Sequence, residues 1–285
     1  MITVTAATGQ LGRLVVADLL DRGVPAGEIT AAVRTPSKAA DLADRGVRVV
    51  EADYDRPETL VPAFTGTDRL LLISGSETGR RIPQHRNAVD AARAANVGLI
   101  VYTSIYKASD SSLKLAAEHA VTEDAIRASG LPFVFLRNGW YLENYTGQVA
   151  QTVSNGAVLG AAGDGRVSAA TRADFAAAAA AVLVDPVAGS IYELGGDEAF
   201  TMSELADEIS SQSGTTVVYR NLPEAEYART LAGFGIPGPF AEILADSDRG
   251  ISVGDLQVDT GDLRRLIGRP TTSLADAVAS ALKSE

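Results

Sequence analysis

A glycine-containing turn close to the N-terminus is the first segment whose residues could bind a ligand. An apolar, β-branched stretch runs into Ala6-Ala7-Thr8-Gly9-Gln10-Leu11-Gly12, and a pattern of helical period follows. In such a turn, backbone N–H groups and the helix N-terminus can approach a pyrophosphate. Gly9 would permit the close approach, and Gly12 would let the helix pack tightly on the strand. A plain strand-to-helix turn is the alternative, but the strand before it and the helix after it favour a dinucleotide site.

The residues after the second predicted strand indicate which dinucleotide binds. NAD binders place an Asp or Glu at this strand end, where it holds the ribose 2′-hydroxyl. This chain has Arg34 at that position, and Lys38 adds a second positive charge shortly after it. A guanidinium can grip a 2′-phosphate through two hydrogen bonds, so the pair favours NADPH over NADH. Asp53, after the third strand, is either an adenine contact or the cap of a local turn.

The residues that common alcohol-dehydrogenase chemistry requires are missing. That chemistry uses Tyr-x-x-x-Lys, in which the lysine lowers the tyrosine pKa, and no tyrosine of this chain has a lysine at that spacing. The chain has no cysteine, and its two histidines, His85 and His119, lie on separate predicted helices. No metal site is therefore expected. A reaction that needs hydride transfer but little acid catalysis, such as quinone reduction, fits these residues better.

Short β-branched runs alternate with segments of helical period along the first half of the chain. Leu11, Val15 and Leu19 are spaced to fill one buried helix face, whereas 70–73 is a continuous apolar run typical of a strand covered on both faces. The alternation predicts an α/β fold with a doubly wound, mostly parallel Rossmann sheet. The predicted strands are 2–6, 30–34, 48–52, 69–73, 98–102, 132–137 and 190–194, and the predicted helices are 11–22, 37–45, 57–64, 83–95 and 112–129.

The sequence changes character after Arg137. Glycines between 156 and 165 and a turn at 235–239 interrupt the alternation, and helical patterns dominate from Thr201 onward. We expect an NADP-binding core over 1–137 with a returning segment around 171–195. A smaller, mainly helical, C-terminal substrate-binding lobe is expected over 138–170 and 196–285. Its predicted elements are helices 201–212, 223–234, 240–247 and 273–283 and a strand at 216–220.

Composition narrows the function classes. The chain has 285 residues, of which 46% are apolar, which is enough to bury a sizeable core. Its formal net charge of -11 repels a phosphate backbone, so no nucleic-acid partner is expected. No apolar run approaches the ~20 residues that span a bilayer, and the N-terminus lacks the basic region of a signal peptide. We therefore expect a cytoplasmic protein. Its oligomeric state stays open, a homodimer included.

Segments spread over nearly the whole chain carry a resemblance to a known family. The most specific is Leu136-Arg137-Asn138-Gly139-Trp140-Tyr141 with Glu143-Asn144-Tyr145 after it. Other matching segments are 7–12, 71–74, 83–87, 102–104, 118–119, 160–165, 170–174 and 244–248. Together they resemble the NADPH:quinone oxidoreductase type 2 family, an NmrA-like group of atypical short-chain dehydrogenase/reductases. The chain departs from the expected pattern at Ala6, where glycine is usual, and at Gly75, where serine is expected.

The resemblance implies NADPH at the carboxyl edge of the sheet and a quinone in a cleft under the smaller lobe. Carried over residue by residue, it assigns Gly9 to Gly12 and Arg34 to the cofactor phosphates and brings Arg172 into the same cleft. The residues implied along the rest of the cofactor are Ser74, Gly75, Ser76, Asn138, Gly139, Trp140, Tyr141, Leu142 and Glu143. No flavin or metal is needed, because the nicotinamide carries the electrons.

Several side chains are candidates for contact with the reacting groups. His119 falls near the helix position at which related proteins place a lysine that contacts the nicotinamide ribose, although a structural histidine is an equal alternative. Thr103 and Ser104 follow the fifth predicted strand at its carboxyl end, where ligands gather. Trp140 and Tyr141 could stack on a planar quinone or on the nicotinamide. We take His119, Asn138 and Tyr141 as the candidate catalytic residues.

The leading hypothesis is an NADPH-dependent reductase that transfers hydride to quinones. A regulator that senses NADP(H) without turnover, as some NmrA-like proteins do, is the alternative, and the missing Tyr-x-x-x-Lys pair supports it equally. A reductase or epimerase acting on another carbonyl compound is a third possibility, because a fold alone does not set a function.

Overall fold

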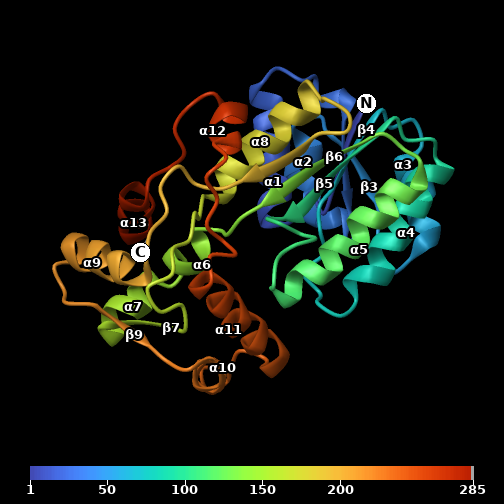
Figure 1. Ribbon diagram of the computed structural model, residues 1–285. Helices are drawn as coiled ribbons and strands as arrows, with labels where there is room; N and C mark the ends of the chain where they lie inside the picture. The colour runs from blue at the N-terminus through green and yellow to red at the C-terminus, as the bar shows by residue number, and fades with distance from the viewer. Residues whose placement is uncertain (284–285) are drawn as a thin grey trace. The chain divides into compact units, whose positions relative to one another are not determined.

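The chain folds into two units. The first contains residues 1–105, 118–138 and 172–192, and the second contains 106–117, 139–171 and the chain from 193 onward. A computed structural model describes residues 1–283 (Figure 1). Over these residues, no helix is both long enough and apolar enough to cross a membrane.

A seven-stranded sheet in the order β3-β2-β1-β4-β5-β6-β8 forms the first unit. The neighbouring pairs from β3 to β6 are all parallel. The strand order reverses between β1 and β4, and open α/β sheets bind ligands at the strand carboxyl ends beside such a point. The predicted α/β fold is confirmed. The strands are β1 (Ile2–Thr5), β2 (Ile29–Val33), β3 (Arg48–Glu51), β4 (Arg69–Leu72), β5 (Leu99–Ile105), β6 (Phe133–Asn138) and β8 (Ile191–Leu194).

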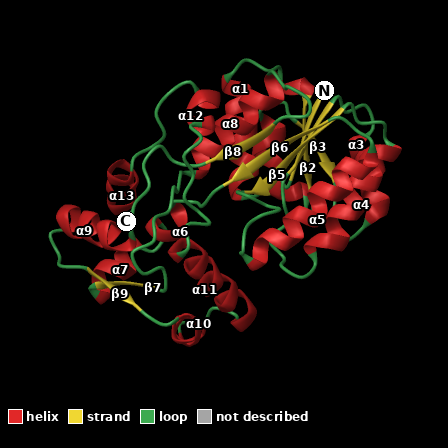
Figure 2. Cartoon of the chain, viewed as in Figure 1, coloured by secondary structure: helices red, strands yellow, loops and turns green. Residues whose placement is uncertain are grey.

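Helices cover both faces of this sheet, because its apolar strands need cover on each side. Helices α1 (Gln10–Asp21) and α8 (Arg172–Val184) pack together on one face (Figures 1 and 2). On the other face lie α3 (Leu60–Phe64), α4 (Arg81–Ala94) and α5 (Lys114–Ser129). The remaining pieces are α2 (Ala40–Asp44) and the short 3-10 helices η1 (Ala26–Glu28), η2 (Pro36–Ala39) and η3 (Pro57–Thr59).

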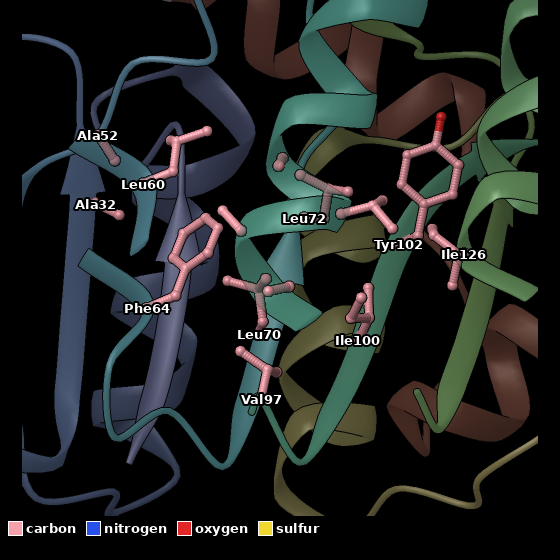
Figure 3. Close-up of a cluster of buried hydrophobic side chains, with 14 of the residues drawn as sticks. Ala32, Ala52, Leu60, Phe64, Leu70, Leu72, Val97, Ile100, Tyr102 and Ile126 are labelled. Carbon is pink, nitrogen blue, oxygen red and sulfur yellow. The ribbon is translucent and has the colours of Figure 1, made fainter. Parts of the chain in front are cut away.

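The core between the sheet and α3, α4 and α5 is apolar except at one end (Figure 3). Leu70 and Leu72 on β4 share a face with Ile100 and Tyr102 on β5, because side chains alternate along a strand. All four side chains are fully buried. The Tyr102 hydroxyl points away from the labelled apolar side chains, so this residue carries a polar group out of the core (Figure 3).

The second unit is mainly helical. Strands β7 (Ala157–Gly160) and β9 (Val218–Asn221) form a two-stranded parallel sheet. The capping box of α9 is complete, since the Thr201 hydroxyl accepts from the Glu204 amide and the Glu204 carboxylate accepts from the Thr201 amide. Its helices are α6 (Glu143–Thr146), α7 (Val149–Asn155), α9 (Met202–Ser213), α10 (Glu224–Gly233), α11 (Gly238–Ser252), α12 (Asp262–Ile267) and α13 (Leu274–Lys283).

The sequence-based prediction of secondary structure is least accurate in the second unit. The glycine-rich stretch was expected to form only turns, yet it contains β7, and the helices α7 and α12 were not predicted. Helix α11 is longer than the predicted 240–247, and it begins inside the expected turn at 235–239. Pro239 lies in its first turn, where the amide that proline lacks would have no intrahelical partner.

Candidate active site at the carboxyl edge of the sheet

The turn after β1 leaves the N-terminus of α1 open. The Gly9 amide donates to the Ala6 carbonyl at 2.8 Å, and the helix starts with no side-chain cap and no acidic residue in its first turn. A Cβ atom at Gly12 would lie 2.4 Å from the Ala6 carbonyl oxygen, so only glycine fits this close contact. Leu11 is buried and can offer a ligand only its backbone amide. An uncapped helix N-terminus of this kind fits a pyrophosphate.

Ala6 adopts a backbone conformation that favours glycine. Its φ is +48°, in the left-handed region, which costs an alanine about 1–2 kcal/mol. The residue is exposed, as is Gln10, whereas Thr8 is half-buried. The departure at Ala6 therefore leaves the shape of the turn intact and stores strain in it.

Arg34 lies directly after β2, where the sequence predicts a 2′-phosphate contact. Its side chain is 67% exposed, and its Nη1 donates to Glu77 Oε1 at 2.9 Å. Lys38, in η2, is also exposed. Asp53 accepts a hydrogen bond from the Asp55 amide at 3.0 Å, which is the local-turn arrangement. Both positive side chains thus lie exposed at the edge of the sheet. A phosphate that binds Arg34 would replace Glu77 as its partner.

The loop after β4 is fixed from three directions beside the reversal point of the sheet. The Ser74 amide donates to Thr103 Oγ1 at 2.9 Å, and the Gly75 amide donates to His85 Nε2 at 3.0 Å. The Arg81 Nε donates to the Gly75 carbonyl at 2.9 Å. Ser76, the next residue, is exposed. These three hydrogen bonds fix the shape of the loop.

Strand β5 extends to Ile105, beyond the predicted end at residue 102, so Thr103 and Ser104 lie within the strand. Their side chains therefore point to opposite faces. Thr103 Oγ1 turns toward Ser74, whereas Ser104 Oγ donates to Glu123 Oε1 at 2.7 Å. The Ser104 hydroxyl thus donates its proton to a buried carboxylate, whereas Thr103 contacts the loop that was expected to line the cofactor.

A buried carboxylate, Glu123, ties α5 to β5 and β6. The side chain is 0% exposed and accepts from Arg137 Nε at 2.8 Å and from Arg137 Nη2 at 2.7 Å. Arg127 adds a third guanidinium bond at 3.1 Å. Because each charge is paired and hydrogen-bonded, this network holds the carboxyl ends of the two strands rigidly.

The two histidines, predicted on separate helices, meet at one hydroxyl group. Tyr102 Oη lies 2.7 Å from His119 Nδ1 and 3.5 Å from His85 Nδ1. Burial, with the positive charge of Arg81 nearby, lowers the pKa of His85 to about 3 and holds the pKa of His119 well below its usual range. Both imidazoles are therefore neutral at ordinary pH.

Sequence reasoning missed Tyr102 and His85, although a spacing rule could have found the first. Side chains two apart on a strand and four apart on a helix share a face with a similar separation. Tyr102 and Ser104 on β5 meet His119 and Glu123 on α5 in this way.

Asn138 is the last residue of β6, at the same edge of the sheet, and the environment of its side-chain oxygen is unusual. The residue is 5% exposed, and its Oδ1 is buried with no hydrogen-bond partner among residues 1–283. An orphaned acceptor in the interior is costly unless a ligand satisfies it. The amide N–H groups of a nicotinamide carboxamide are suitable donors, so Asn138 and the open end of α1 both fit a nicotinamide dinucleotide.

The segment after Asn138 lies in the second unit and is held by backbone bonds. The Gly139 amide donates to the Leu194 carbonyl at 2.7 Å, and the Trp140 carbonyl accepts from the Ala170 amide at 3.0 Å. The Leu142 amide donates to the Ala170 carbonyl at 2.9 Å, and Glu143 begins α6. Trp140, Tyr141 and Glu143 are half-buried and Leu142 is buried. Arg172, in the first unit, is the half-buried first residue of α8.

A second buried carboxyl group, Asp248, lies in the second unit among tyrosines. Its Oδ2 accepts from the Ala161 amide at 2.7 Å, and the Tyr219 hydroxyl accepts from the next amide, Ala162, at 3.0 Å. Burial raises the pKa of Asp248 to about 6. Among the described residues, no group of three or more potential metal ligands occurs in either unit.

Comparison with known proteins decides the family. A family described as NAD(P)H-binding matches residues 6–186 of the chain. The chain is 49% identical over 280 residues to Quinone oxidoreductase 2 of Escherichia coli, covering 98% of each protein. This chain belongs to that NAD(P)H-binding family of quinone oxidoreductase 2 proteins. The resemblance drawn from the sequence motifs is confirmed.

Solved structures agree with this placement. The crystal structure of the NADPH-dependent quinone oxidoreductase of Escherichia coli, complexed with NADPH, matches with a TM-score of 0.96 at 48% identity, over 99% of this chain and 100% of that one. The Citrobacter sp. triphenylmethane reductase, complexed with NADP(H), matches with a TM-score of 0.94 at 41% identity, over 99% and 100% of the two chains. The family thus includes members with different named acceptors.

Proposed function

We propose that this chain is an NADPH-dependent reductase that transfers hydride to quinones. The observation that carries the proposal is the 49% identity to a quinone oxidoreductase over essentially the whole of both chains. The open α1 N-terminus and the orphaned Asn138 oxygen support it, because each provides what a nicotinamide dinucleotide needs. When bound, NADPH supplies the hydride, so the protein has to bind, orient and shield the reacting rings.

The cofactor-binding residues divide by the part of the dinucleotide that they would hold. Gly9 to Gly12 offer backbone amides to the pyrophosphate, and the loop Ser74–Ser76 lies beside them at the reversal point of the sheet. Arg34 and Lys38 bind the 2′-phosphate, with Arg34 leaving Glu77 to do so. Thr103 supports the loop through Ser74. Asp53, whose Oδ1 accepts from the Asp55 amide, is proposed to contact the adenine.

Several residues are proposed to act near the reacting groups. Asn138 orients the carboxamide, which fixes the nicotinamide ring, and His119 donates a hydrogen bond to a ligand oxygen. Trp140 and Tyr141 provide flat surface for a planar acceptor. Gly139, Leu142 and Glu143 keep that segment in place, and Arg172 contributes positive charge. Because the reaction consumes NADPH, we also propose that it takes place in the cytoplasm.

Steady-state turnover tests the proposal against the sensing alternative. Purified protein is mixed with NADPH and a panel of benzoquinones and naphthoquinones, with NADH as the parallel cofactor. We expect NADPH absorbance to fall continuously, with clearly less turnover from NADH. Tight NADPH binding with no turnover on any quinone would instead support a regulator.

Substitution of Arg34 tests the cofactor assignment. In Arg34→Leu we expect the Kd for NADPH to rise by about 10- to 100-fold, the loss of one or two charge-assisted hydrogen bonds, while the Kd for NADH stays unchanged. The matched control is Arg80→Leu, because Arg80 is also exposed and also pairs with Glu77. An equal loss for both cofactors in Arg34→Leu would contradict the 2′-phosphate role.

A further inference from the structure

The hydroxyl group of Tyr102 occupies an enclosed position between α4, β5 and α5. Its ring extends from the apolar core (Figure 3). Its hydroxyl lies within hydrogen-bond distance of one imidazole from each helix, His85 on α4 and His119 on α5. Tyr102, His85 and His119 are 0%, 1% and 6% exposed, respectively. Because these groups are so little exposed, the hydrogen bonds between protein atoms indicate where most of the protons lie.

The proton on His85 is assigned first. A backbone N–H can only donate, so the bond from the Gly75 amide requires that His85 Nε2 carry a lone pair. The neutral ring then has its proton on Nδ1, which lies 3.0 Å from Thr122 Oγ1. That hydroxyl is free to accept, because its own proton goes to the Glu118 carbonyl at 2.9 Å. His85 Nδ1 consequently cannot accept the proton of Tyr102.

We assign the proton on Tyr102 to the bond with His119. The shortest contact of its hydroxyl is the one to His119 Nδ1 at 2.7 Å, and an acceptor at Nδ1 leaves the proton of this neutral imidazole on Nε2. Within the described residues, Nε2 has no hydrogen-bond partner, and it is not among the fully buried polar atoms without one. It therefore keeps some access to the outside of the protein.

We propose that Tyr102 and His85 are positioning residues, which hold His119 as a neutral hydrogen-bond donor whose Nε2–H is directed to an acceptor oxygen of the bound ligand. Only the identity of that ligand rests on the proposed function. A ribose hydroxyl of the dinucleotide and a carbonyl oxygen of the quinone offer the same acceptor chemistry.

The same residues link this donor to the loop that lines the dinucleotide. His85 holds the Gly75 amide, and Arg81, one helical turn before it, holds the Gly75 carbonyl and pairs with Glu118 at 3.3 Å. The loop after β4 and the orientation of His119 are thus set by one connected group of side chains. A change at Tyr102 should therefore alter hydrogen bonding at His119 without unfolding the sheet.

Nitrogen-15 NMR of the imidazoles tests the proton assignment independently of activity. In the wild-type protein we expect an unprotonated Nδ1 and a protonated Nε2 on His119, and in Tyr102→Phe a mixture of the two tautomers. The control is Tyr54→Phe, because Tyr54 is a half-buried tyrosine whose hydroxyl donates to Thr5 Oγ1 and the Ile73 carbonyl instead. A protonated Nδ1 in the wild-type protein, or an unchanged tautomer in Tyr102→Phe, would overturn the proposal.

Replacement of His119 by the two amides tests the donor itself. The Gln side chain carries its NH₂ group near the position of Nε2, whereas the Asn side chain reaches only the position of Nδ1. We expect His119→Gln to stay near wild type and His119→Asn to lose about tenfold, the effect of one hydrogen bond. A loss in the Kd for NADPH assigns the acceptor to the dinucleotide, and a loss confined to the quinone kcat/KM assigns it to the quinone. Equal values for the two variants in both measurements would rule out a donor at Nε2.

Discussion

Two buried carboxyl groups, Glu123 in the first unit and Asp248 in the second, have opposite kinds of partner. Glu123 is fully buried and receives bonds from the Arg137 guanidinium, from Arg127 and from Ser104. Asp248 is 7% exposed and receives a bond from the Ala161 amide, with tyrosine rings around it. Guanidinium groups compensate the first charge, whereas burial raises the pKa of the second to about 6.

The difference shows two ways in which a buried carboxyl group can be accommodated. In the first unit, the charge is used to lock strand ends together, and this lock positions Asn138 and Tyr102 on the neighbouring strands. In the second unit, Asp248 has a pKa raised to about 6, so its carboxyl group gains a proton as the pH falls through this value. A paired charge gives a rigid scaffold, and an unpaired one gives a group whose state depends on pH.

The largest effect is expected where the paired charge is removed. Glu123→Gln leaves Arg137 buried without a counter-charge, so we expect the free energy of unfolding to fall by about 3–5 kcal/mol. Urea denaturation measures the loss. The control is Asp124→Asn on the same helix, which removes a carboxylate that is 78% exposed and should change stability by less than about 1 kcal/mol. Similar losses for the two variants would mean that burial does not distinguish these carboxylates.

Replacement of Asp248, the carboxyl group without a guanidinium partner, should raise the free energy of unfolding, and the gain should depend on pH. The folded pKa of Asp248, about 6, is above the ordinary value of 3.8, so the wild-type protein loses stability as pH rises through this interval. The Asp248→Asn variant does not lose stability in this way, because its amide does not ionise, and its side-chain oxygen can still accept from the Ala161 amide. Relative to wild type, we expect it to gain on the order of 2 kcal/mol between pH 4 and pH 7. Thermal unfolding of both proteins over this range measures the gain, and a difference that does not grow with pH would contradict the account.

The smallest effect is expected at two residues that share the left-handed backbone conformation, one in each unit. Ala6 in the first unit has a φ of +48°, and Gly156, after α7 in the second, has a φ of +63°. Ala6→Gly should raise the free energy of unfolding by about 0.5–1 kcal/mol, since the relief of strain exceeds the entropy that glycine adds to the unfolded chain. Gly156→Ala should lower it by a similar amount. Changes of the same sign in the two variants would show that backbone strain does not control these turns.

Much of the first unit could be predicted from the sequence because its elements have strong local signals. Apolar β-branched runs located the strands, and strand–helix alternation indicated the parallel sheet. The second unit lacks these signals. Its glycines were interpreted as turns, although Gly160 lies in β7, where a Cβ atom would come within 2.7 Å of Asp248 Oδ2. That close contact joins segments far apart in the chain, so no local pattern reveals it.

The candidate site divides in the same way. The turn at Gly9 and the strand end at Arg34 could be predicted because each depends on neighbours in the sequence. The contact of His85, Tyr102 and His119 could not, because it forms only when α4, β5 and α5 pack together. The bond from Ser104 to Glu123 could not be predicted either, because the two residues meet only when α5 packs on β5.

A single-turnover experiment with deuterated cofactor tests the central claim most directly. Protein saturated with NADPH, carrying deuterium at the transferable position of the nicotinamide ring, is mixed with a benzoquinone in a stopped-flow instrument. The account predicts that NADPH is oxidised in a one-to-one ratio with the hydroquinone formed, and more slowly than with unlabelled cofactor, because hydride passes directly between the bound rings. Bound NADPH that stays reduced in the presence of the quinone would contradict it.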